Sequence, residues 1–539
     1  MRRYGREARY YFLIFLLFSL FYIVYGYAAL GTNDDWALEN LLRAKGVYGT
    51  LIMSYPLSYL VSHLYDLLPG IQWYSLLLSS LMLLNFSFIA LYITGRSSPL
   101  QKITLLILSL LLMTYLWFNL TITAMTILTM LSALGFSKKN IYLSVVLLFA
   151  ASLLRTEMML ILLPFFVTGF LIVREKLSLS RGETAAVILL ALLTAGNIAI
   201  QKQDRDYTKW LSFNKARASI ADLHGGWQDH ILNHQESVIL AGGWVQDEEI
   251  LSSEKVLKIP SSLQKTIVAE LKTASIEFYF TRYKFRYWIW LLSLASLIAM
   301  ALNLKSRRAL LIPLFAAGVF LLLLVRDVER VTVLLFVMWA FVLSERFRPY
   351  RYLDTFFIAL FTLLFYYYAS GQLGYRHYRE NTALQKEAKE LIGESGIACE
   401  PSINFPTRWT PAVTSLFQAN YLFRETSWPK LNQHEILPAG WLSRHPYFYE
   451  THEISHNGIK RRYSNYHDFL LDDHTGFIGG KEITDNQKSR ILLDRYDALY
   501  LKGRPQCRHR VKIVKSSAHF AISQITVECN STVLKQNIQ

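Results

Sequence analysis

Residues 10–30 read YYFLIFLLFSLFYIVYGYAAL, an uncharged run that decides the fold class. An apolar helix of about twenty residues crosses the hydrocarbon core of a bilayer, which is about 30 Å thick. Basic MRRYGREAR precedes the run, and polar GTNDDW follows it without a small-residue cleavage site. We therefore expect an uncleaved first membrane span and not a signal peptide.

The rest of the chain repeats this pattern. Hydrophobic residues make up 53% of its 539 residues, above the roughly 45–50% of soluble proteins, which argues against a purely soluble enzyme. By the same length rule, the sequence predicts a mainly α, polytopic transmembrane helical bundle of about eleven spans. Two of the blocks, 121–136 and 141–154, are short enough to be re-entrant or tilted instead. The blocks after the first span are 71–94, 103–119, 121–136, 141–154, 157–173, 185–200, 287–303, 309–325, 331–344 and 352–370.

Short basic connections explain the positive charge of the chain. It has 56 Lys and Arg against 40 Asp and Glu, a formal net charge of +16. Cytoplasmic loops of membrane proteins are rich in Lys and Arg, so no nucleic-acid partner is needed. If the amino terminus is cytoplasmic, every second connection is basic, and an odd number of spans puts the carboxyl terminus outside. These connections carry Arg96, Lys102, Lys138, Lys139, Arg174, Lys176, Arg181, Lys305, Arg307, Arg308, Arg346, Arg348 and Arg351.

Three long segments fall on the outer side in this topology. Residues 31–70 mix apolar and polar residues at helical spacing and predict amphipathic helices on the membrane surface. Residues 201–286 form a charged, Trp-containing outside loop. We thus divide the chain into a transmembrane domain, residues 1–370, and an extracytoplasmic soluble domain, residues 371–539, which is long enough to fold by itself.

The end of the soluble domain alternates apolar and polar residues in short runs, which is typical of strands. We expect an α+β domain there. Cys507 and Cys529 flank such a stretch, and two strands joined by a turn could bring them within disulfide reach. Cys399 would then stay free or replace one of them. With three cysteines and no CxxC spacing, the chain predicts neither a disulfide framework nor a structural zinc site.

Two adjacent carboxylates, Asp34 and Asp35, follow the first span directly. One interpretation is structural: Asn33 or Asp34 would cap a helix that starts at Trp36. The other is chemical, because neighbouring carboxylates must be solvated, paired or used to bind a cation. An acidic pair in the first outside loop of a protein with many spans and a large outside carboxyl-terminal domain resembles the C-type integral-membrane glycosyltransferases (GT-C).

This resemblance implies a GT-C-like layout and a bacterial inner-membrane enzyme. It would move a sugar from a polyprenyl-phosphate-linked donor to a cell-envelope glycan or glycolipid acceptor at the outer face. In that family, a carboxylate of the first-loop motif acts as general base on the acceptor hydroxyl or holds the acceptor, which assigns Asp34 or Asp35. Such a base contributes about 10²–10⁴-fold. We expect no cofactor, although the sequence leaves a divalent metal requirement open.

The leaving phosphate should meet basic side chains near the outer face. Charged residues at breaks between apolar blocks are the candidates, because charges there are costly and often functional. Arg155 with Glu157 interrupts one pair of blocks, and Arg326 with Arg330 interrupts another. Each break could instead be a polar turn with an internal ion pair, Arg155 with Glu157 or Arg326 with Asp327. Arg330 is favoured over Arg326 because it starts a helix.

The long outside loop offers a further amide and guanidinium. On a helix, Trp210, Asn214 and Arg217 share one face, and Asn214 with Arg217 would suit a sugar or a diphosphate. An amphipathic interfacial helix with solvated charges is the alternative. Trp227 and Trp244 could stack on a sugar or anchor the loop at the interface.

Missing motifs narrow the function. No Walker loop, no GxGxxG and no HExxH occurs, which argues against ATP-driven transport, dinucleotide redox chemistry and zinc proteolysis. Two alternatives stay open. An O-antigen or polysaccharide polymerase or ligase would carry its chemistry on loop arginines, and a transporter or lipid flippase would show inverted repeats, which we do not find.

Overall fold

The computed structural model describes a defined part of the chain. It divides into two compact units that we describe separately. The helical unit comprises residues 1–204, 272–374 and 420–424, and the sheet unit comprises the remaining residues. The described residues are 2–24, 35, 38–39, 42, 49–50, 52–96, 98–138, 140–174, 179–221, 254, 256–257, 286–302, 310–325, 329–379, 382–395, 398–401, 453–456, 459–462, 467–468, 471–473, 475–480 and 487–529.

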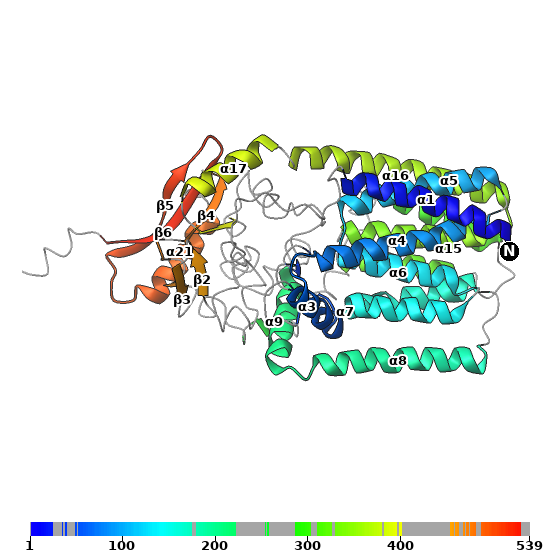
Figure 1. The fold of residues 1–539 in the computed structure, drawn as a ribbon, viewed down its shortest axis with the longest axis horizontal. Coiled ribbons are helices and arrows are strands. Elements are labelled where there is room, and N and C mark those ends of the chain that lie inside the picture. Colours follow the sequence, from blue (N-terminus) through cyan, green and yellow to red (C-terminus); the bar gives the residue numbers. More distant parts are fainter. Residues whose placement is uncertain are drawn as a thin grey trace, which may run out of the picture. The chain divides into compact units, whose positions relative to one another are not determined.

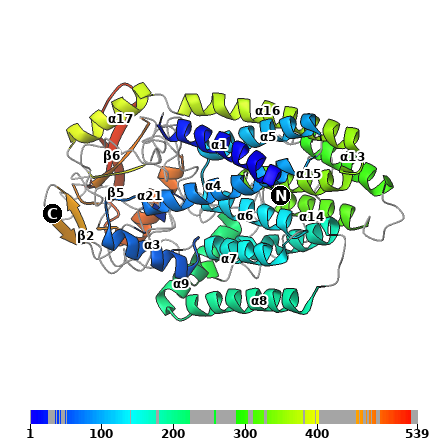
Figure 2. The same ribbon diagram turned by 45° about the vertical axis from the view of Figure 1, so that its right-hand side comes forward.

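Long apolar helices build the helical unit. In both views α1, α4, α6 and α7 run alongside one another (Figures 1 and 2). Their apolar side chains form one continuous buried core. The helices are α1 (Arg2–Val24), α3 (Tyr55–Leu67), α4 (Trp73–Thr94), α5 (Pro99–Phe118), α6 (Ile122–Phe136), α7 (Ile141–Val173), α8 (Arg181–Gln201), α13 (Arg286–Leu302), α14 (Leu311–Val325), α15 (Glu329–Phe347) and α16 (Arg351–Arg379).

Six of the described helices are long and apolar enough to cross a membrane, judged by length and composition. This confirms the prediction of a mainly helical chain with several candidate membrane spans, but the count of eleven spans and the GT-C-like layout are not confirmed. Several apolar blocks form helices shorter than a full span: α6 and α14 have 15 residues each, and α13 has 17. A helix of 15 residues is about 22 Å long, short of the hydrocarbon thickness.

Helix α7 is a hairpin of two helices joined at Arg155. This residue has extended backbone angles, φ −152° and ψ 91°. Just before the hairpin, Lys138 lies 3.9 Å from the Glu345 carboxylate, and at its end the Ile172 carbonyl accepts from Arg346. A straight helix of 33 residues would be about 50 Å long. Both ends can approach the same end of α15 only because the chain reverses at Arg155.

Helix α6 lies at the centre of the helical unit. Its residues from Ile122 to Leu134 are all buried, and a helix that is apolar on every side belongs in a core. The Thr121 hydroxyl accepts from the Ala124 amide at 3.0 Å and caps the helix. The first turn of α6 is therefore both buried and capped, and side chains from other elements contact it.

A buried ion network lies at the end of the helical unit where α4 and α15 finish. Arg96 donates to Asp354 at 3.0 Å and to Glu345 at 3.2 Å, and Ser344 and Gln101 also donate to Asp354. Burial alone would lower the pKa of the Arg96 guanidinium. Its neighbours Tyr92, Asp354 and Glu345 outweigh burial, so the pKa is raised above its usual value and Arg96 keeps its charge.

This network joins connections that the sequence places on one side of the membrane. Arg96, Lys138 and Arg348 come from three different connections, and all three contact Glu345. Their meeting at one end, called the basic end below, agrees with alternating passes. The side of the membrane on which the basic end lies stays a prediction.

Reporter fusions test that side. Alkaline phosphatase folds and is active only outside the cytoplasm, so a fusion after Ser370 should be active and a fusion after Arg307 inactive. Immunoblots should show equal amounts of both fusions. The opposite pattern would contradict the predicted orientation and, with it, any chemistry at the outer face.

The sheet unit contains helices and a small sheet. Strand β1 (Ala398–Pro401) pairs parallel with β4 (Thr475–Gly480), which pairs antiparallel with β6 (Phe520–Cys529), and β6 pairs antiparallel with β5 (Cys507–Ser516). A separate hairpin joins β2 (Glu453–His456) to β3 (Ile459–Arg462). Helices α9 (Arg205–Ala221), α17 (Thr382–Ser395) and α21 (Gln487–Tyr500) belong to the same unit. This architecture confirms the expected α+β character.

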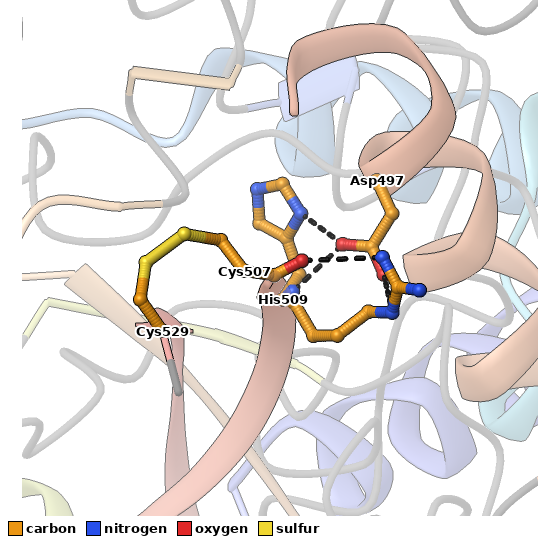
Figure 3. The surroundings of a disulfide bond; sticks show 5 residues. Asp497, Cys507, His509 and Cys529 are labelled. Atoms are coloured by element: carbon orange, nitrogen blue, oxygen red, sulfur yellow. Dashed lines mark hydrogen bonds and ion pairs between the residues drawn. A yellow bond between two sulfur atoms is a disulfide. The ribbon is translucent and has the colours of Figure 1, made fainter. Parts of the chain in front are cut away.

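A disulfide bond links Cys507 to Cys529, as the strand pattern predicts (Figure 3). The two residues stand directly opposite each other at the start of β5 and the end of β6, with 4.0 Å between their Cα atoms. Two positions farther along β5, buried His509 binds the Asp497 carboxylate through its backbone amide at 2.7 Å and its ring Nδ1 at 2.8 Å. The disulfide therefore closes the β5–β6 hairpin, and α21 binds the same hairpin through Asp497.

Removal of this disulfide should weaken the sheet unit. The cysteines are 22 residues apart, and opening a loop of that size costs about 3 kcal/mol by the chain-entropy relation. In the variant with Cys507→Ser and Cys529→Ser, amide hydrogen exchange in β5 and β6 should accelerate. Unreduced wild-type peptides should show the linked pair in a mass spectrum. Two free thiols there would contradict the bond.

Candidate functional site

Asp35 is buried at the amino end of α6. Its side chain has 2% exposure, and its Oδ1 accepts from the Tyr74 hydroxyl at 2.6 Å and from the Ile122 backbone amide at 2.8 Å. Ile122 is the first residue of α6, whose amino end carries a partial positive charge. Asp35 thus binds the end of a helix 87 residues later in the chain, a structural contact that sequence analysis did not foresee.

Arg155 reaches the same turn of α6 from the other direction. At the reversal of α7, its guanidinium donates to the Thr123 hydroxyl, one residue beyond the amide that binds Asp35. It also lies within electrostatic reach of Tyr74. The first turn of α6 therefore gathers the acidic first loop and the basic break of α7, two features that sequence analysis selected independently.

A second carboxylate, Glu39, belongs to this cluster. It has 2% exposure, and its Oε1 accepts from the Tyr65 hydroxyl at 3.2 Å and from Ser75 at 3.5 Å. The Tyr65 hydroxyl in turn accepts from the Tyr74 backbone amide at 3.0 Å. Glu39 is not among the residues that the sequence pattern singled out. Its four-residue spacing from Asp35 was a signal, since residues at that spacing share one face of a helix.

Two buried carboxylates with one nearby cation can support acid and base chemistry. Buried charges are costly unless hydrogen bonds or opposite charges compensate them. Hydroxyls of two tyrosines, a serine and a helix amide compensate Asp35 and Glu39. Arg155 brings a positive charge to Thr123, the residue after that helix amide. We call the set Asp35, Glu39, Tyr65, Tyr74 and Arg155 the acidic cluster.

The other predicted site residues of the membrane part lie only partly within the described structure. Asp34 and Arg326 lie outside the described residues. Arg330 is in α15, but its side chain is not described, and Glu157 is half-buried two residues beyond the α7 reversal.

Asn214 and Arg217 lie on α9, so the helix that both interpretations of this segment assumed is present. Trp210 is buried and packs edge-on against Tyr207. Asn214 is half-buried, and the Arg217 side chain is outside the described part. Because α9 belongs to the sheet unit, its residues are described apart from the acidic cluster.

A metal site in the described part of the chain would need several His, Cys, Asp or Glu side chains close together. No group of three or more His, Cys, Asp or Glu side chains in this part of the chain could hold a metal ion. The predicted lack of a cofactor stays a prediction.

Comparisons with models of known protein families, with curated proteins and with solved structures find no match to this chain.

Proposed function

We propose that this chain is an integral-membrane glycosyltransferase of the GT-C type. It would transfer a sugar from a polyprenyl-phosphate-linked donor to a glycan or glycolipid acceptor of the bacterial cell envelope. The reaction would take place at the outer face of the inner membrane. The single observation that carries the proposal is the meeting of Asp35 and Arg155 at the first turn of α6.

The proposed chemistry needs opposite charges on the two sides of a sugar. A carboxylate of the Asp34–Asp35 pair accepts the proton of the acceptor hydroxyl as its oxygen attacks the anomeric carbon. The bond from that carbon to the lipid phosphate breaks, and the phosphate leaves with the electron pair. Arg155 is proposed to stabilise the charge that develops on this phosphate.

The contacts of Asp35 suggest how the pair divides its roles. Its Oδ1 is engaged by Ile122 and Tyr74, so Asp35 fixes the first loop to α6 whatever else it does. Either carboxylate can serve as the base in this proposal, and single Asn variants distinguish them.

Binding of undecaprenyl phosphate, the lipid product of the reaction, tests the role of Arg155. In detergent, the Arg155→Gln variant should bind this lipid about tenfold more weakly than the wild type, because a charge-assisted contact is lost. Glutamine keeps a polar side-chain donor and removes the charge. Lys102→Gln is the matched control, since Lys102 pairs with Glu7 away from the acidic cluster. Equal affinity of all three proteins would contradict the donor site.

A further inference from the structure

A second site is built at the basic end of the helical unit. A cavity of about 150 Å³ lies among α4, α5, α6, α15 and α16. Its wall is mostly apolar and includes Leu112, Leu131, Phe341 and Phe361. Empty apolar cavities of about this size bind a six-carbon ring such as benzene, so a stretch of one hydrocarbon chain fits.

Cations line one side of this cavity. Lys138 and Arg348 are among its lining residues, and so is Glu345. Lys138 lies 3.9 Å and Arg348 3.5 Å from the Glu345 carboxylate. The side chains of Lys138 and Arg348 are 32% and 37% exposed, whereas that of Glu345 is 5% exposed. A ligand that approaches from the protein surface thus meets the two cations before the Glu345 carboxylate.

Basic and acidic side chains meet at this rim. Arg96 pairs with Asp354 at 3.0 Å and with Glu345 at 3.2 Å. Lys138 and Arg348 reach the same Glu345 carboxylate from partly exposed positions, where an anion can approach without losing all of its hydration.

We infer that the cavity holds part of one acyl chain of an anionic phospholipid, whose phosphate headgroup contacts Lys138 and Arg348. Apolar wall and cationic rim together select this occupant, because a soluble anion would use only the rim and a neutral lipid only the wall. Basic pockets between membrane helices commonly bind anionic headgroups. The inference does not depend on the proposed function.

Lipid-dependent stability of the full chain in detergent tests the site. Phosphatidylglycerol should raise the melting temperature, and phosphatidylcholine with the same acyl chains should raise it clearly less. Inorganic phosphate at equal concentration should have no effect, which separates a lipid headgroup from free phosphate. Equal effects of the two lipids, or an equal effect of phosphate, would overturn the inference.

Variants separate the rim from the wall. Lys138→Gln combined with Arg348→Gln should weaken phosphatidylglycerol binding about tenfold, measured by native mass spectrometry. Gly135→Leu should weaken binding of both lipids by filling the cavity, since a Cβ at Gly135 would meet only the Phe341 ring, at 3.6 Å. Lys102→Gln removes a cation that does not line the cavity and should bind as the wild type does.

Melting temperatures without lipid show first that each variant folds. If Gly135→Leu does not fold, the rim variant decides alone, because its changes are at partly exposed side chains. Wild-type affinity of the folded rim variant would overturn the inference.

Discussion

Asp34→Asn or Asp35→Asn, whichever replaces the general base, should lower the rate of sugar transfer by about two orders of magnitude or more. Asparagine keeps the size of the side chain and an oxygen acceptor but cannot take up the acceptor proton. At position 35 its Oδ1 can still accept from Ile122 and Tyr74, the two donors of Asp35. The folded protein should therefore persist while transfer is lost. A reconstituted assay with labelled polyprenyl-phosphate sugar measures the rate.

Two further variants distinguish chemistry from anchoring. Asp35→Ala leaves two buried donors without their acceptor, at about 1–3 kcal/mol for each, so it should also lower the melting temperature. Tyr74→Phe removes one donor of Asp35 and keeps the ring, and its stability should change less. If both Asn variants transfer sugar at nearly the wild-type rate, the first-loop mechanism is wrong. The loop-arginine alternative around Arg217 would then be the better explanation.

Arg96→Met should destabilise the helical unit by about 3–5 kcal/mol, because it removes the cation paired with the buried Asp354 carboxylate and one of the three cations that contact Glu345. Asp354 is fully buried, and the Glu345 side chain is 5% exposed. Methionine has a similar length and leaves no large cavity, so the loss reports on charge. Thermal unfolding in detergent, with a folded-state probe such as Trp fluorescence, measures the difference.

A matched pair of controls makes this result specific. Lys102→Met breaks a partly exposed ion pair with Glu7, and such pairs contribute about 0–1 kcal/mol. Combining Arg96→Met with Asp354→Leu removes a cation and an anion together, and should recover much of the lost stability. Unchanged stability of Arg96→Met would contradict the role of the buried network.

Local sequence patterns predicted the elements that depend on local interactions. The break Leu154–Glu157 between two apolar blocks predicted separate passes, and α7 does reverse at Arg155. The alternation near the carboxyl terminus predicted paired strands with Cys507 opposite Cys529, and their register confirms it. These features depend on residue spacing along one or two neighbouring segments.

The acidic cluster could be predicted only in part. Asp35 and Arg155 stood out because charges next to apolar spans are conspicuous. Their common contact, the first turn of α6, depends on how distant helices pack, and no local pattern encodes that. Tyr74 could not be assigned to the cluster from the sequence either. A tyrosine at the start of an apolar helix is typical of an interfacial anchor.

The hydrogen bond from Ile122 to Asp35 also bears on how the chain is made. The two residues are separated by 87 positions, and ribosomes add about 5–20 residues per second. About 4–17 seconds thus pass between the synthesis of Asp35 and the synthesis of Ile122, whose backbone amide donates to it. During that interval Asp35 and Glu39, which are buried in the folded protein, have already been synthesised. Asp35 still lacks the hydrogen bond that α6 supplies. Until α6 is synthesised, water or another protein has to supply the hydrogen bonds to the Asp35 carboxylate.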